Sequence, residues 1–120
     1  MSLPNQINSG DWSASQFFLD EFSLRLHQAV AERLRRNPND ILQTARENLR
    51  RWLAAQGDHV AALLEWKNLL ETVAPEKLAR IITQKTDEGQ RLRSSSPFAG
   101  VLSDAEREAI WRKCAEGEFV

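Results

Sequence analysis

The sequence contains one cysteine, Cys114, and no tyrosine, and it has only five glycines and four prolines among 120 residues. A single cysteine excludes a disulfide within the chain and is usual in a reducing compartment. No apolar run approaches the roughly 20 residues of a membrane-spanning helix, and the first residues lack the basic and apolar segments of a secretory signal. We therefore expect a cytoplasmic protein that does not enter a membrane.

Patterns typical of β-strands are missing as well, because no stretch alternates polar and apolar residues. Hydrophobic residues make up 42% of the chain and charged residues 28%, a balance that favours a folded domain over disorder. A chain of 120 residues is long enough for one hydrophobic core. The sequence therefore predicts an all-α fold, a compact bundle of five or six short helices. We expect a flexible tail at residues 1–12, one helical domain at residues 13–117 and a frayed end at residues 118–120.

Apolar periodicity and capping residues set the expected helix boundaries. The first helix should start at Ser13 or Ser15 and end before Pro38, because a residue that precedes proline disfavours helical geometry. Gly57 fits the C-terminal cap of the second helix, and Asp58 fits the N-cap of the third. The expected helices span residues 13–37, 41–56, 59–73 and 75–82, with a last helix from residue 103.

The segment before the last helix contains the least helical part of the sequence. "TDEGQRLR" either continues the fourth helix or starts a new one at its threonine, and three serines and a proline follow in "SSSPFAGVL". Ser103 and Glu106 form a capping box, so the apolar run from Phe98 to Leu102 lies outside any helix. Because an exposed apolar run promotes aggregation, we expect this loop either to close the open end of the bundle or to be covered by a partner's groove.

Two interpretations of Trp66 remain open. Leucines already supply the apolar face of the third expected helix, with Leu63, Leu64 and Leu70 predicted to be buried. Trp66 lies at the margin of that face. It is therefore either a core residue or an anchor for a protein partner, a role in which tryptophan is common.

Catalytic and metal-binding patterns are missing. The two histidines, His27 and His59, stand apart from each other and from Cys114, so no spacing typical of metal ligands occurs. Cys114 lies on a predicted apolar helix face, where a core role suits it better than that of a nucleophile. The chain also lacks a glycine-rich phosphate loop and a G-x-S-x-G turn. We expect neither catalysis nor a bound cofactor or metal.

Basic residues are concentrated in one segment. Residues 24–53 contain seven arginines against three acidic residues, whereas residues 1–23 contain three acidic residues and no basic one. The arginines expected to cluster are Arg33, Arg35, Arg36, Arg46, Arg50 and Arg51. They favour an acidic protein partner, the chain's own acidic segments or nucleic acid. A pI near 6.1 and a turn "RNPND" that lacks glycine argue against DNA.

Three stretches resemble a group of short bacterial proteins of unassigned activity: "LHQAVAERLRRNPNDILQTARENLRRW", "EWKNLLE" and "RLRSSSPFAGVLSDAEREAIW". Members share an L-H-x-x-V-A-x-x-L-R start, an E-W-x-x-L-L centre and an L-R-x-S-S-P-F-A-G-V-L ending. The likeness covers residues 24–112. It implies a small helical protein that is encoded beside a toxin enzyme and neutralises this enzyme by binding it.

We therefore expect a non-catalytic binding protein, an antitoxin that acts on a larger toxin enzyme, with a DNA-binding regulator of its own operon as the alternative. Arg91 and Arg93 stand just before Ser94–Ser96, and this group either holds an anion or simply ends a helix. No oligomeric state follows from the sequence. The residues expected to contact the partner are Arg46, Arg50, Arg51, Trp66, Arg91, Arg93 and Phe98.

Overall fold

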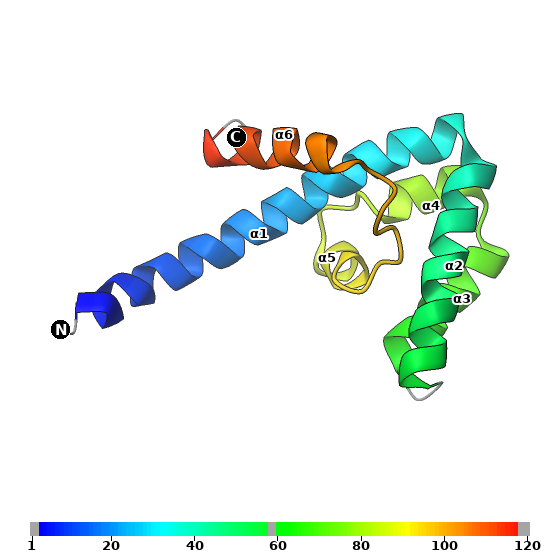
Figure 1. The fold of residues 1–120 in the computed structure, drawn as a ribbon, viewed down its shortest axis with the longest axis horizontal. Coiled ribbons are helices and arrows are strands. Elements are labelled where there is room, and N and C mark those ends of the chain that lie inside the picture. The colour runs from blue at the N-terminus through cyan, green and yellow to red at the C-terminus, as the bar shows by residue number, and fades with distance from the viewer. Residues whose placement is uncertain (1–2, 58–59, 118–120) are drawn as a thin grey trace.

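Helix α1 (Leu3–Arg36) is the longest element, and the other helices gather around its middle and its C-terminal part (Figure 1). The computed structural model describes residues 3–57 and 60–117, with side chains from residue 16 onward. The further helices of this described chain are α2 (Pro38–Gln56), α3 (Ala61–Thr72), α4 (Pro75–Ile81), α5 (Asp87–Arg93) and α6 (Asp104–Ala115). Six helices confirm the predicted all-α bundle.

The predicted start of the first helix at Ser13 or Ser15 is wrong, because α1 begins at Leu3. Pro4 lies in the first turn, where its missing N–H interrupts no helical hydrogen bond. Gly10 weakens a helix by about 1 kcal/mol but does not end it. The helix therefore crosses the predicted domain boundary at residue 13. Flexibility of residues 1–12 stays a prediction, and residues 118–120 lie outside the described residues.

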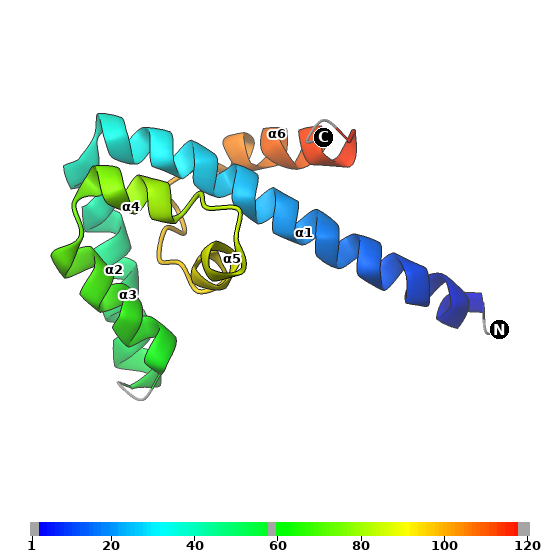
Figure 2. The ribbon, with the colours of Figure 1, turned by 180° about the vertical axis from the view of Figure 1, so that it is seen from behind.

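The helices are arranged around one end of α1. Helices α2 and α3 form an antiparallel pair that crosses the C-terminal end of α1, and α4 lies beside that end (Figures 1 and 2). Helix α6 packs along the middle of α1, while the short helix α5 faces α1 from another side. In both views the N-terminal part of α1 extends beyond the other helices.

Local capping rules hold at three helix ends. Gly57 ends α2 with a φ of 85°, a left-handed conformation that glycine adopts without strain. Thr86 accepts a hydrogen bond from the backbone N–H three residues on, so α5 is a new helix and not a continuation of α4. Ser103 and Glu106 form the predicted capping box of α6. Asp58, the predicted cap of the third helix, lies outside the described residues.

The inward face of α3 differs from the prediction. Leu63, Trp66 and Leu70 are buried at spacings of three and four residues, which place them on one helix face. Leu64 follows Leu63 by about 100° around the helix and is 40% exposed, so its predicted burial is wrong. Trp66 is fully buried and belongs to the hydrophobic core.

The loop between α5 and α6 closes the bundle, as one of the two interpretations predicted. Pro97, Phe98 and Leu102 are buried in it, and Phe98 packs edge-to-face on Trp66 with ring centroids 5.7 Å apart. Asn48 of α2 fixes the loop, because its Nδ2 donates to the carbonyl oxygens of Pro97 (2.9 Å) and Ala99 (2.7 Å). This buried side chain thus holds the loop to α2 over a sequence distance of about fifty residues.

Replacing Asn48 with alanine is expected to lower the free energy of unfolding by about 2 kcal/mol, because the buried Pro97 carbonyl loses its donor. Urea denaturation of the variant measures this loss. Asn68→Ala is the matched control, since Asn68 is exposed on α3. Asn48→Asp keeps the shape and removes the donors, so it should destabilise as well. Equal stability of Asn48→Ala and the control would show that the loop does not depend on these bonds.

Candidate binding site

A groove of about 380 Å³ runs between α2 and α3. Its residues recur every three or four positions on each helix, so the antiparallel pairing brings the two rows together. Leucines from both helices form its apolar floor. Charged side chains line its edges. The groove residues are Arg46, Leu49, Arg50, Leu53, Lys67, Leu70 and Glu71.

The edges of this α2–α3 groove carry an excess of positive charge. Arg46, Arg50 and Lys67 are exposed, and no ion pair joins them to any residue of the described chain. Glu71 is the single carboxylate among the groove residues. An apolar floor edged by three such cations suits a ligand that combines apolar groups with negative charges.

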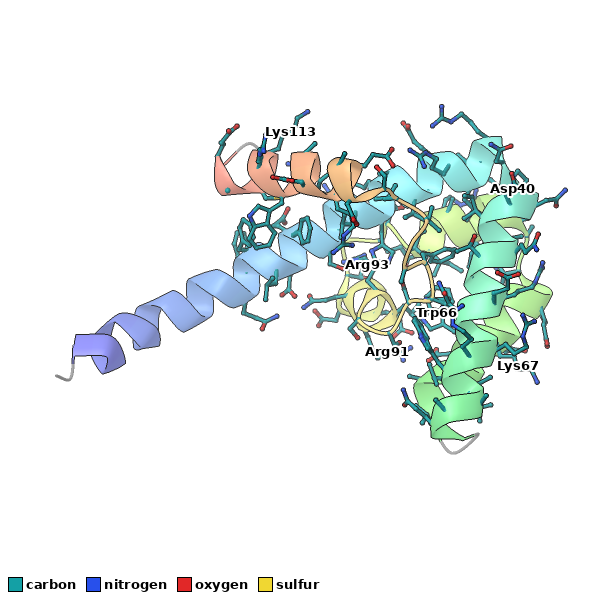
Figure 3. All side chains as sticks on the ribbon, viewed as in Figure 1. Asp40, Trp66, Lys67, Arg91, Arg93 and Lys113 are labelled. Atoms are coloured by element: carbon teal, nitrogen blue, oxygen red, sulfur yellow. The ribbon has the colours of Figure 1, made fainter. Side chains whose placement is uncertain are left out.

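The structure brings Arg46 and Arg50 together as predicted and adds Lys67, which the sequence did not single out. Figure 3 shows Lys67 on the outer side of the α2–α3 pair and Trp66 on its inner side. The predicted short link between the two helices already implied their pairing. The link does not determine how α3 is rotated about its own axis, and the position of Lys67 depends on this rotation. Arg51 lies near this edge of α2, but its Nη2 donates to Asn48 Oδ1 at 2.6 Å.

The predicted roles of Trp66 and Phe98 as partner anchors are wrong. Trp66 has no exposed surface, and its Nε1–H donates to the carbonyl oxygen of Leu92 at 3.0 Å. Phe98 is 4% exposed. The two rings pack edge-to-face on each other in the same hydrophobic core. Trp66 therefore has no surface to offer a partner, and Phe98 has very little.

Arg91 and Arg93 have intramolecular roles. Arg91 donates to both oxygens of Glu65 (2.8 and 2.9 Å) and pairs with Glu88, and its hydrogen bond lowers the pKa of the Glu65 carboxyl. Arg93 is buried, and burial lowers the pKa of its guanidinium. Ser94 Oγ donates to the Arg91 carbonyl oxygen at 2.7 Å, which is typical of a helix end. Neither arginine belongs to the α2–α3 groove, and their contact with a partner stays a prediction.

The predicted arginine cluster is divided by ion pairs. Arg33 of α1 pairs with Glu106 of α6, and Arg35 pairs with Glu76 of α4 at 3.1 Å. The chain's own acidic residues thus neutralise part of the cluster, as one of the three interpretations predicted. Arg46 and Arg50, the cluster members that line the groove, form no ion pair with a described residue.

His27 joins α1 to the loop. Its Nδ1–H donates to the Ser23 carbonyl oxygen, and its Nε2 accepts from the Ser96 hydroxyl, both at 2.7 Å. Because a carbonyl oxygen can only accept, this tautomer follows from the geometry. Burial lowers the pKa of His27 to about 4, so the ring is neutral at neutral pH. Cys114 is buried on α6, and burial raises the pKa of its thiol.

Comparison of the chain with protein-family models, with curated proteins and with solved structures finds no match. Within residues 3–57 and 60–117, no three histidine, cysteine or acidic side chains converge as metal ligands. None of the helices in this part of the chain is both long and apolar enough to cross a bilayer. The function is therefore inferred from the surface of the chain itself.

Proposed function

We propose that this chain is a non-catalytic binding protein that holds an acidic, amphipathic segment of a larger protein in the α2–α3 groove. The observation that carries the proposal is the combination of a leucine floor with three edge cations, Arg46, Arg50 and Lys67, that form no ion pair in the described chain. Such cations attract carboxylates during encounter, and the apolar floor supplies affinity once water has left.

A helix with apolar residues at positions i and i+4 and with acidic residues on both sides fits this surface best. Its apolar side chains would contact Leu53, which is half-buried, and the small exposed parts of Leu49 and Leu70, each 4% exposed, while its carboxylates would meet the arginines of α2 and the lysine of α3. Arg46 and Arg50 are one helical turn apart, so they match carboxylates that are spaced by one turn as well.

The larger partner is proposed to be a toxin enzyme, which this chain neutralises by covering or deforming its active site. The resemblance of residues 24–112 to proteins from toxin–antitoxin-like gene pairs supports this choice. A DNA-binding regulator is supported less, because Arg33 and Arg35 are ion-paired and the groove floor is apolar. DNA binding needs exposed cations that track phosphates, and its affinity falls steeply with salt.

The double substitution Arg46→Glu, Arg50→Glu is expected to weaken binding of an acidic amphipathic peptide at least tenfold. The peptide has leucines at i, i+4 and i+8 and glutamates beside them, and fluorescence anisotropy measures its affinity. The control pair Arg112→Glu, Lys113→Glu makes the same charge change on α6, far from the groove (Figure 3), and should leave affinity unchanged. A peptide with lysine in place of glutamate should not bind. Equal weakening by both pairs would contradict a site in the groove.

Coexpression tests the antitoxin part separately. Expression of the neighbouring gene alone is expected to arrest growth, and the wild-type chain should restore it and copurify with the product. The Arg46→Glu, Arg50→Glu variant should do neither. If the neighbour is harmless and the two proteins do not copurify, the antitoxin proposal fails. A shift of upstream DNA at low salt that the same variant abolishes would favour the regulator instead.

A further inference from the structure

A second cavity, of about 200 Å³, lies between the loop, α1 and α6, apart from the α2–α3 groove. Its apolar wall consists of Leu26 and Val30 from α1 and of Phe98 and Leu102 from the loop. These side chains are already held by the hydrophobic core. The wall is therefore preformed, as is usual for small-molecule sites.

Two arginines line the polar side of this cavity, Arg93 from α5 and Arg107 from α6. No ion pair joins either one to a described residue, and none of the residues lining the cavity is acidic. Arg107 is exposed, and its guanidinium carbon lies 5.8 Å from the centroid of the Phe22 ring. Asp20 and Glu21 of α1 attract the Arg93 guanidinium through space, but neither of them lines the cavity, so the two arginines meet no carboxylate within it.

Only one nitrogen of the Arg93 guanidinium, Nη1, forms hydrogen bonds with described residues. Arg93 is 8% exposed, and its Nη1 donates to the carbonyl oxygens of Ile82 (3.3 Å) and Gln84 (2.7 Å). Its Nε is buried and has no hydrogen-bond partner among the described residues. This Nε has almost no accessible surface, so a ligand in the cavity cannot reach it. Nη2 donates to no described residue and is not fully buried, so it is the Arg93 group that a carboxylate can meet.

The remaining polar groups of the cavity are already satisfied. His27 and Ser96 bond each other, and the second nitrogen of His27 bonds the Ser23 carbonyl oxygen. The Ser96 hydroxyl donates its hydrogen to His27, so it offers only acceptor lone pairs to a ligand. The guanidinium groups are therefore the side-chain donors left for an anion.

We propose that this cavity binds a small organic acid of the size of one aromatic ring, with its carboxylate at Arg93 and Arg107 and its apolar body against Leu26, Val30 and Phe98. The volume supports a ligand of this size, since cavities of about 150 Å³ hold benzene. A ligand with an apolar body is favoured over a bare inorganic anion, because a hydrated ion would have to give up water where it meets the apolar wall. This ligand site is independent of the α2–α3 groove and of its protein partner.

Benzoate is the probe, titrated into the full chain and followed by the amide resonances of Ala99 and Gly100, which line the cavity. Saturable shifts are expected with benzoate, and at least fivefold weaker binding with benzamide, which has the same ring but no charge. Arg107→Gln should weaken benzoate binding at least fivefold and leave the fold intact, because Arg107 is exposed. Arg112→Gln is the matched control on α6 and should bind as the wild type does.

The proposal is overturned by the absence of a saturable shift with benzoate, by equal affinity for benzamide or by unchanged binding to Arg107→Gln. Phosphate is titrated as well, and binding of phosphate as tight as that of benzoate would assign an inorganic anion to the cavity in place of an organic acid. The groove variant Arg46→Glu, Arg50→Glu should bind benzoate normally. The proposal of a ligand site and the proposal of a protein-binding groove can thus be disproved independently of each other.

Discussion

Replacing Trp66 with alanine is expected to lower the free energy of unfolding by about 4 kcal/mol, the largest loss that we expect from a single substitution in this chain. The side chain is fully buried at the centre of the core, between α3 and the loop that closes the bundle. Its removal leaves a cavity that the rigid helices cannot fill. It also takes away the edge-to-face contact with Phe98 and the donor to the Leu92 carbonyl oxygen.

Urea denaturation measures this loss, and two variants separate its causes. Trp66→Phe keeps most of the volume and loses the Nε1–H bond, so a loss of about 1–2 kcal/mol is expected. Trp111→Ala removes a tryptophan that is 42% exposed and packs on Phe18 and Phe22, and it should cost less than Trp66→Ala. A chain that tolerates Trp66→Ala as well as Trp111→Ala would contradict the role of Trp66 as the centre of the core.

Acid is expected to destabilise the protein by about 3 kcal/mol between neutral pH and pH 4, through His27. Burial lowers the pKa of this histidine from 6.5 to about 4 in the folded chain, whereas the unfolded chain keeps the ordinary value. Below pH 6.5 the unfolded state therefore binds a proton that the folded state does not bind. The stability that neutral His27 contributes is complete above this pH and is lost as the pH falls towards 4.

Denaturation curves at several pH values between 7.5 and 5 isolate this effect, because the pKa of the Glu65 and Glu88 carboxyls is lowered from 4.5 and these groups stay ionised there. The variant His27→Gln should show a much flatter pH dependence over this window. His59, the other histidine of the chain, is the same in the variant and in the wild type. An unchanged slope in His27→Gln would contradict a buried, neutral His27.

The helices that could be predicted are those whose ends are set by neighbouring residues. Gly57 and the Ser103–Glu106 capping box act within one turn of the chain and lie where their local chemistry predicted. At Thr86 the sequence left two alternatives open, and the structure starts a new helix there. The start of α1 was missed because no strong signal stops a helix between Pro4 and Ser13. Polar residues there were interpreted as a tail, although they also fit a helix.

The candidate groove was predictable only in part. Arg46 and Arg50 were singled out because basic residues are concentrated in residues 24–53, but the contribution of Lys67 depends on how α3 packs on α2. Asn48 was missed because a polar residue on an apolar helix face gives no sign of the carbonyl oxygens that it will meet. Pro97 and Ala99 are brought to it by the loop, about fifty residues along the chain.

The sequence by itself determined the all-α class, the order of the helices and most of their boundaries, because apolar periodicity and capping are interactions among residues within a few positions of one another. Only the tertiary structure decided that Trp66 is buried and Leu64 exposed, that Arg33 meets Glu106, and that the loop and α6 enclose a cavity with Arg93. These features depend on the rotation and packing of helices that are distant in sequence. This packing depends on the volumes and charges of side chains throughout the chain. It therefore cannot be predicted from a pattern of neighbouring residues.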